Sequence, residues 1–383
     1  MSLHVEVAPR TLDWAVQRSH RPLEELTRRL PKLPAWLAGA SSPTLPQLEQ
    51  LAAATYTPLG LLLLPEPLQE QLPIPDFRTF ADEQLTGPSA NLLDTLALCI
   101  QRQDWYRDYA RANALPAPGF VGSLVTEVPV GIAAGQIAEV LDFSITSRER
   151  YPSWSAARSG LIEQAERAGV LVMVSGVVAS NTSRPLDRHE FRGFALADPL
   201  VPVIFINATD SQAAQIFTLA HELAHLWLGE SGVSDPAVEQ PSSGVIERWC
   251  NQVAAELLVP RASFLDAFHA QTPVEAQIGP LAQRYRVSTL VILRRALDLD
   301  LMSRPAFLAA YVAERDRILA LDAQRPPGGS FYNTQPVRTS KRFMRAVLSD
   351  TLEGRTLYSD AFHLLSFRSP KALTELAERL DVR

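Results

Sequence analysis

The sequence predicts an α+β fold that is mainly helical and contains one small β-sheet. Apolar residues recur at helical spacing along most of the 383 residues, whereas short runs rich in Val, Ile or Phe are few. The predicted strands are residues 170–174, 190–196 and 201–207. Two breaks rich in proline and other turn residues, near 65–75 and 325–334, divide the helical segments around this sheet.

Length and composition indicate a globular chain of two or three domains. Apolar residues make up 46% of the sequence and charged residues 20%, which is ordinary for a folded domain. We expect domains over residues 1–72, 76–270 and 271–383. The net charge of −6 argues against nucleic-acid binding by the chain as a whole.

The cysteine content points to a reducing environment. Cys99 and Cys250 both lie in apolar helical patterns, so neither a disulfide framework nor a cysteine zinc cluster is expected. A cytoplasmic location fits this usage best. The chain has no run of about 18 apolar residues, so we expect no membrane span and no membrane partner.

Residues 210–229 have the form of a mostly buried helix. Asp210 or Ser211 can cap its start, and Gly229 follows its last apolar residue. Its apolar residues recur at helical spacing. These signals fix the position of the helix before any chemistry is considered.

This helix carries a candidate metal site. His221 and His225 are four residues apart and therefore lie on one face, where two imidazoles can share one zinc ion. Glu222 is next to His221, close enough to hold a water on that ion. The alternative is a pair of ordinary core histidines. The order His-Glu-x-x-His on a helix favours the metal.

Two downstream carboxylates compete to be the third ligand. Residues 244–258 are predicted to form a helix, and nine residues at about 100° each place Glu247 and Glu256 on opposite faces. Asn251 follows Glu247 by one turn, where its amide can orient a ligand. Glu256 has no such companion and is followed by apolar residues. We therefore favour Glu247.

The HELAH sequence at 221–225 and ERWCNQVAAELLVP at 247–260 resemble the ImmA/IrrE family of metallo-endopeptidases. That family has HExxH followed by Glu-x-x-Ala-Asn-x-Phe-Ala-Ala-x-Leu-Leu-Met-Pro. The exchanges here are small or apolar, at Cys250, Val253 and Val259. The resemblance is strongest over residues 195–300. It implies a zincin-like core and a selective endopeptidase that cleaves a repressor-type protein in stress response or mobile-element control.

A mechanism follows from these residues. Zinc would be held by His221, His225 and Glu247 with a water in the fourth position, and Glu222 would take the proton of that water as it attacks a peptide carbonyl. Manganese can replace zinc in cells, because affinity order alone does not fix the metal in use. The developing oxyanion needs a further electrophile. Four residues are open candidates: His189, His269, Tyr285 and Arg188.

The N-terminal domain is predicted to contain helices over residues 10–19, 22–30 and 45–55. Residues 24–51 resemble the helix-turn-helix of XRE-type repressors, but Pro31 and Pro34 shorten or break the segment expected to read DNA. Residues 1–66 hold six basic and six acidic side chains, whereas a DNA-reading helix brings a basic excess. DNA binding and a helical docking or dimerisation module are equal alternatives.

Three further expectations concern the surroundings of the site. Strand 201–207 is our candidate for pairing with the substrate backbone, and a fully buried strand is the alternative. Residues 230–243 are expected to form an exposed loop over the cleft. Aromatic residues of the predicted helix 89–112 are assigned to the core. They are Trp105, Tyr106 and Tyr109.

Residues 281–295 are predicted to form helix, turn and helix, similar to the small helix-turn-helix after the family's peptidase core. Four arginines make the segment basic, and we favour a solvated packing helix over DNA contact. They are Arg284, Arg286, Arg294 and Arg295.

A function of another class is also open. The chain could be a DNA-binding regulator or an antitoxin-like protein, with DNA or a toxin on residues 1–72 and a structural or vestigial zinc site. An intact Glu222 argues against a vestigial site, because a structural site has no use for a base.

Overall fold

The computed structural model describes six stretches of the chain, over residues 4–77, 87–149, 151–234, 244–269, 271–322 and 331–382. Contacts between residues divide the chain into two compact units. The N-terminal unit comprises Met1–Pro73 and Phe80–Ala97, and the larger unit comprises Ile74–Thr79 and Leu98–Arg383. Within the described residues, no helix is long and apolar enough to cross a membrane.

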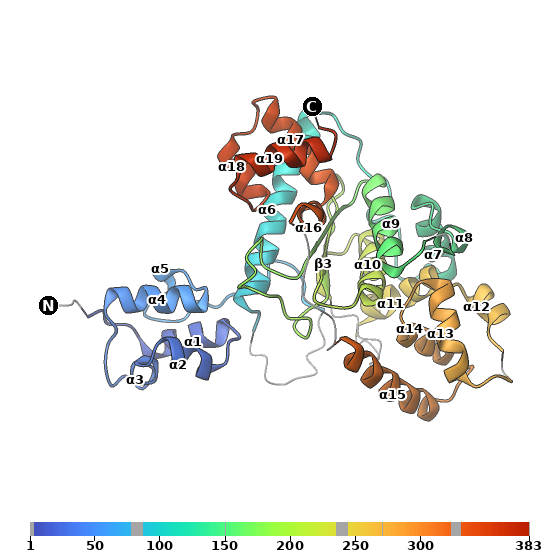
Figure 1. Ribbon diagram of the computed structural model, residues 1–383, viewed down its shortest axis with the longest axis horizontal. Helices are drawn as coiled ribbons and strands as arrows, with labels where there is room; N and C mark the ends of the chain where they lie inside the picture. Colours follow the sequence, from blue (N-terminus) through green and yellow to red (C-terminus); the bar gives the residue numbers. More distant parts are fainter. Residues whose placement is uncertain are drawn as a thin grey trace. The chain divides into compact units, whose positions relative to one another are not determined.

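The N-terminal unit contains short helices around its own apolar core (Figure 1). They are α1 (Pro9–Arg18), α2 (Leu23–Arg29), α3 (Leu33–Leu37), α4 (Leu45–Thr55) and α5 (Leu59–Leu62). Leu12, Leu26 and Leu48 are among its fully buried side chains. The prolines at 31 and 34 act as expected, because α2 ends at Arg29 and α3 has only five residues.

The larger unit is organised around a four-stranded mixed sheet in the order β1-β3-β2-β4. Its strands are β1 (Leu171–Ser175), β2 (Gly193–Leu196), β3 (Val203–Asn207) and β4 (Gly232–Ser234). β1 runs parallel to β3, and β2 is antiparallel to both β3 and β4. Every residue of the four strands is buried. The three predicted strands are confirmed.

One expectation about the site's surroundings is wrong, and a second is wrong for the three residues of a short strand. The strand at 203–207 lies inside the sheet, and its hydrogen-bonding edges are used by β1 and β2, so it has no edge left for a substrate. The predicted loop 230–243 contains β4, which is buried and paired with β2. The remainder of that loop, 235–243, lies outside the described residues.

Helices surround the sheet in the larger unit (Figure 1). They are α6 (Ala90–Ala112, from Leu98 onward), α7 (Val130–Val140), α8 (Ile145–Glu149), α9 (Trp154–Arg167), α10 (Gln212–Leu228), α11 (Val245–Leu258), α12 (Arg261–Ala267), α13 (Val274–Tyr285), α14 (Thr289–Asp298), α15 (Arg304–Asp322), α16 (Phe331–Arg338), α17 (Lys341–Leu352), α18 (Tyr358–Leu364) and α19 (Pro370–Arg379).

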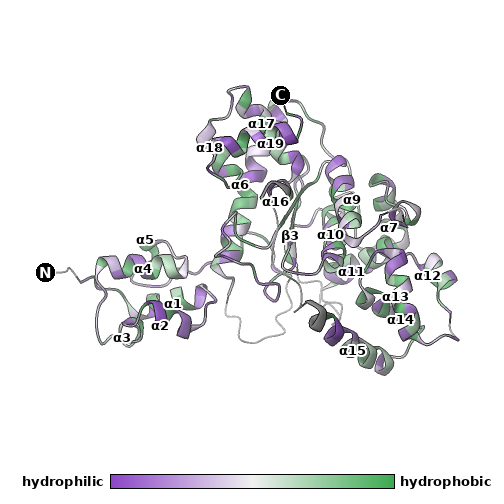
Figure 2. Ribbon diagram, in the orientation of Figure 1, coloured by the Kyte–Doolittle hydropathy of each residue, from purple (hydrophilic) through white to green (hydrophobic). Residues whose placement is uncertain are grey.

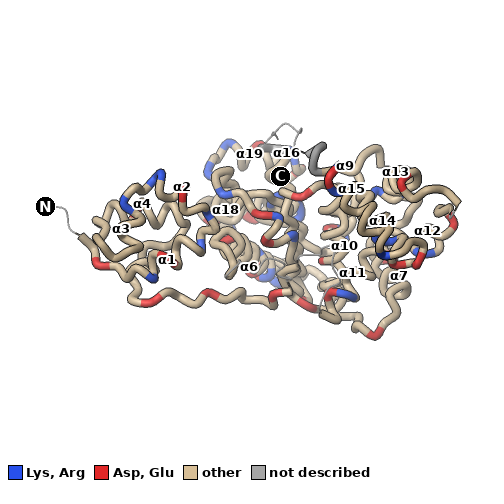
Figure 3. Tube along the Cα trace, turned by 90° about the horizontal axis from the view of Figure 1, so that it is seen from below, with Lys and Arg blue, Asp and Glu red and all other residues tan. Residues whose placement is uncertain are grey.

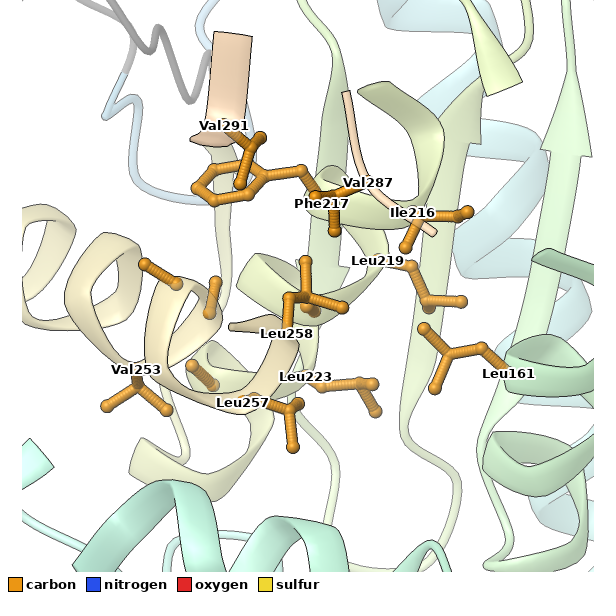
Figure 4. Close-up of a cluster of buried hydrophobic side chains, with 14 of the residues drawn as sticks. Leu161, Ile216, Phe217, Leu219, Leu223, Val253, Leu257, Leu258, Val287 and Val291 are labelled. Atoms are coloured by element: carbon orange, nitrogen blue, oxygen red, sulfur yellow. The ribbon is translucent and has the colours of Figure 1, made fainter. Parts of the chain in front are cut away.

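The main core lies where α10 meets the sheet, α9 and α11. Figure 4 shows Leu161 of α9, Leu223 of α10 and Leu257 of α11 in one apolar cluster. Burying a side chain of this size contributes about 1.5–3 kcal/mol. Hydrophobic residues are frequent on α10 and α11 (Figure 2), which are therefore held in place by packing rather than by helix propensity.

The core assignment of the α6 aromatic residues is confirmed for Tyr106 only, because Trp105 and Tyr109 are half-buried. Tyr106 is buried, and Trp105 stacks on Tyr109 and meets Phe343 of α17 edge to face. The predicted turn-rich break at 325–334 is wrong in its last part, because α16 already begins at residue 331. Residues 323–330 lie outside the described part of the chain.

The four arginines around α13 and α14 have partners within the unit. Arg295 pairs with Glu256, Arg294 with Asp298, and Arg284 with Glu149. The fourth, Arg286, lies over the Trp154 ring. Basic and acidic residues both occur in this region (Figure 3). The pairing favours a packing role for these helices.

Candidate metal centre

Local signals define the ends of α10 as the sequence predicts. The Ser211 hydroxyl accepts a hydrogen bond from the backbone N–H of Ala214, so Ser211 is the capping residue. Asp210 instead accepts from the N–H of Ser211. The helix ends at Gly229, whose φ of 74° lies in the left-handed region that glycine tolerates. Residues 215–227 are all buried.

Three side chains converge on one point from α10 and α11. His221 Nε2 and His225 Nε2 lie 3.0 Å apart. The two carboxylate oxygens of Glu247 lie 3.3 Å from His221 Nε2 and 2.9 Å from His225 Nε2. Ligands of a tetrahedral zinc with bonds of about 2.0–2.2 Å are about 3.3 Å apart, so these three side chains fit a zinc ion after shifts of a few tenths of an ångström.

Burial and mutual charge set the protonation of these ligands. Burial alone would raise the pKa of Glu247, but the charges and hydrogen bonds of His221 and His225 outweigh it and hold that pKa well below its usual value. Burial lowers the pKa of His225 and outweighs the hydrogen bond with Glu247, which raises it. Both shifts act in the direction that metal binding requires, toward an ionised carboxylate at Glu247 and a neutral imidazole at His225.

Glu222 lies beside the three ligands and is fully buried. Burial, with a smaller contribution from the charge of Glu247, raises its pKa well above the usual value. Its carboxylate lies against the backbone of β2. A Cβ at Gly193 would lie 2.9 Å from Glu222 Oε1 and 2.7 Å from Thr218 Cγ2. Position 193 therefore requires glycine for the close approach of α10 to the sheet.

The structure brings Glu247, and not Glu256, to the histidines. Glu256 accepts a hydrogen bond from the backbone N–H of Arg261 at 3.0 Å and forms an ion pair with Arg295. The two glutamates lie on opposite faces of α11, as expected, so Glu247 is a candidate ligand and Glu256 pairs with Arg295 and the Arg261 backbone. Asn251 lies one turn after Glu247 on α11 and is half-buried. Its orienting role stays a prediction.

The four candidates for stabilising the oxyanion lie in three different segments of the larger unit. Tyr285 is fully buried on α13, and its hydroxyl shares a 2.9 Å hydrogen bond with the Ser263 hydroxyl. His189 is exposed in a turn held by Asp187, and Arg188 precedes it there. The fourth, His269, is tied through its backbone to the Gln277 amide. The oxyanion role stays open among these four.

Two residues beside the ligands were not found from the sequence. Ser234 ends β4, is fully buried, and places its hydroxyl 3.5 Å from both His225 Nε2 and Glu247 Oε1. The Phe77 ring stacks on the His225 ring, with centroids 5.5 Å apart and planes 19° apart. Neither residue belongs to a periodic pattern, so no local signal marks them. Only the pairing of β4 brings them here.

Comparison with known proteins agrees with this geometry. Residues 165–297 match the model of the IrrE N-terminal-like domain, called peptidase M78, and residues 339–379 match a domain of unknown function. The chain is 34% identical over 96 residues to the radiation response metalloprotease IrrE of Deinococcus radiodurans. This match covers 24% of the chain and spans only 29% of that relative's length.

The matched region contains the whole His-His-Glu cluster together with the sheet and helices that position it. Its limits enclose α10, α11, α13 and all four strands. Residues 165–297 therefore match the IrrE N-terminal-like domain and contain a candidate metal site, and part of the chain is similar to the radiation response metalloprotease.

Proposed function

We propose that the chain is a zinc-dependent endopeptidase that selectively cleaves a repressor-type regulatory protein. One observation carries the catalytic part of this proposal. The Nε2 atoms of His221 and His225 lie 3.0 Å apart, each lies 2.9–3.3 Å from one of the two Glu247 carboxylate oxygens, and the Glu222 carboxylate is their neighbour. A zinc site with three protein ligands and an adjacent base is the arrangement used for peptide hydrolysis.

The residues of the chain have distinct tasks in this reaction. His221, His225 and Glu247 would hold the metal, which, when bound, polarises a carbonyl and lowers the pKa of a water to roughly 7. Glu222 accepts the proton from the attacking water and delivers it to the leaving amine. In the metal-free protein burial raises the pKa of Glu222, and a bound cation would lower it again toward the ionised form that accepts a proton.

Selectivity is the second part of the proposal. The domain match covers residues 165–297, so much of the chain lies outside the catalytic region. A few side chains near the scissile bond discriminate by only modest energies, whereas a docking surface adds contacts that a wrong partner lacks. Residues 1–72 and 270–383 are our candidates for that surface. The resemblance to ImmA/IrrE peptidases supports a repressor as the partner.

The direct test combines metal content with cleavage of a repressor encoded beside this chain's gene. The purified protein should contain about one zinc per chain and cut the repressor at one site, with little activity on casein. His221→Ala and His225→Ala should each lose zinc and cleavage. Full zinc occupancy in both variants would show that His221 and His225 are not zinc ligands. Efficient cleavage of casein would contradict the proposed selectivity.

The docking role of the N-terminal unit has its own test. Deletion of residues 1–72 should slow cleavage of the repressor while zinc stays bound at His221 and His225. Undiminished cleavage by the truncated protein would contradict docking by this unit. The expectation follows from its separate apolar core, which lets the unit be removed without opening the core around α10.

The alternative function is a DNA-binding regulator or an antitoxin-like protein. The N-terminal unit favours it to the extent that α2, α3 and α4 follow one another as short helices with a common core. A gel-shift assay at stated salt, run beside the cleavage assay, separates the two functions. Specific retardation of DNA without cleavage of any neighbouring gene product would favour the regulator.

A further inference from the structure

A short extended segment of the larger unit lies along the edge strand beside the metal ligands. The N–H of Phe77 donates to the Val233 carbonyl at 3.0 Å, and the Val233 N–H donates to the Pro75 carbonyl at 3.0 Å. Asp76 thus faces Val233 in a parallel bridge. The other edge of β4 pairs with β2. The backbone N–H and carbonyl of Val233 that point away from β2 are therefore already hydrogen-bonded to Pro75 and Phe77.

The Phe77 side chain occupies a defined position against His225 and Gly232, called here its seat. Its ring stacks on His225 and covers Gly232 so closely that a Cβ there would lie 2.2 Å from the Phe77 ring. Position 232 therefore requires glycine to admit the aromatic ring. A half-buried ring from a connecting segment covers one face of a proposed zinc ligand.

The reacting groups are closed off in this arrangement. Glu222 and His221 have no exposed surface, and His225 is 1% exposed. A peptide bond must approach Glu222 to be cleaved, so part of the surroundings has to move first. Phe77 contacts His225 through its ring and bonds to Val233 through its backbone N–H, and Pro75 adds a second backbone hydrogen bond, whereas α10 and α11 belong to the central core.

Peptide substrates commonly bind by adding a strand to an exposed sheet edge, where main-chain groups provide affinity and side-chain seats provide selectivity. We propose that residues 74–77 occupy the substrate's place on β4, and that the substrate puts an aromatic or large apolar side chain into the seat of Phe77. This inference rests on the proposed peptidase function. Residues 74–77 are then an internal competitor that the substrate displaces.

The sequence of the segment fits a preformed strand. Proline restricts the residue before it to extended conformations, and Pro75 acts in this way on Ile74. Pro75 uses only its carbonyl in pairing, so its missing N–H costs nothing. Both ends of the segment lead in sequence into the N-terminal unit, Met1–Pro73 and Phe80–Ala97. A repressor bound to the N-terminal unit could therefore displace residues 74–77, because this segment is connected in sequence to that unit.

The test measures strand binding without cleavage. The zinc-loaded full chain carrying Glu222→Gln is titrated with a fluorescent peptide, Leu-Pro-Ile-Pro-Asp-Phe, which copies residues 72–77. Adding Phe77→Ala should tighten peptide binding about tenfold, because the stacked Phe77 ring no longer competes with the aromatic side chain of the peptide. Leu68→Ala, which shortens an exposed apolar side chain earlier in the same connection, is the matched control and should bind like the parent.

The side-chain seat is tested with a second peptide that has Ala in place of Phe. It should bind the Phe77→Ala protein about tenfold more weakly than the parent peptide does. Phe77→Leu retains apolar bulk and should give an intermediate affinity. Equal peptide affinity in the parent, Phe77→Ala and Leu68→Ala proteins overturns the proposal.

Hydrogen exchange provides a reading that does not depend on the variants. The amides of Phe77 and Val233 should be protected in the parent protein, and rapid exchange of both overturns the internal pairing. The proposed function fails separately, through absence of zinc or of cleavage by the wild-type chain. A chain that holds zinc and cleaves its repressor, yet shows no change in peptide binding, contradicts the internal competitor alone.

Discussion

The two ends of α11 carry the same side chain with different partners. Glu247, in the first turn, faces two imidazoles and is 5% exposed. Glu256, in the last turn, faces the guanidinium of Arg295 and the backbone of Arg261. One carboxylate keeps its charge available for a metal, and the other uses its charge to hold α14 and α12. Helix phase alone decides which role a glutamate on α11 has.

Removal of each carboxylate should separate the two roles with the largest effect. Glu247→Gln should weaken zinc binding by more than about 100-fold and abolish cleavage, since a ligand outweighs the residues that merely orient ligands. Glu256→Gln should leave zinc bound and lower the free energy of unfolding by about 1–3 kcal/mol through the lost pairing with Arg295. Metal analysis and urea unfolding measure both effects. The reversed pattern would identify Glu256 as the third ligand.

Glu222 tests whether the cluster at the first end of α11 is catalytic or only structural. Glu222→Gln should retain zinc and the fold but reduce cleavage by roughly 10²–10⁴-fold, the usual contribution of a general base. Glu139→Gln, an exposed change on α7, is the control and should cleave normally. Normal cleavage by Glu222→Gln would leave the zinc without a base at this position and favour a structural site.

A change at Ser234 tests whether β4 helps to orient Glu247 and His225. Its hydroxyl lies 3.5 Å from both His225 and Glu247, so Ser234→Ala should lower zinc affinity about tenfold by loosening their orientation. Competition with a chelator measures the change. Unchanged affinity would mean that the packing of α10 and α11 positions the ligands without help from the strand.

The smallest expected effect is a pH dependence of the zinc-free protein. The pKa of Glu222 is raised in the folded state by burial and then by Glu247, whereas the unfolded group ionises at its ordinary pKa of about 4.3. Stability is therefore full below the unfolded pKa and falls as the pH rises toward the folded pKa. Glu222→Gln should raise the Tm of the zinc-free protein more at pH 8 than at pH 5. A difference that shrinks with rising pH would contradict the raised pKa.

The sequence by itself determined the helix that carries His221 and His225, its caps, and the phase that separates Glu247 from Glu256. These features depend on hydrogen bonds and side-chain directions within one or two helices. Both follow from the periodic spacing of residues in the sequence. The apolar runs of β1, β2 and β3 were equally visible, because a buried strand needs apolar residues whatever its partners are.

Only the tertiary structure decided which strands pair and what reaches the metal ligands from outside α10 and α11. The burial of β3, the brief β4 with Ser234, and the place of Phe77 against His225 all arise from contacts between residues far apart in the chain. Strand pairing is set by such contacts and by the fit of whole surfaces, so three residues such as Gly232–Ser234 carry no periodic signal of their own.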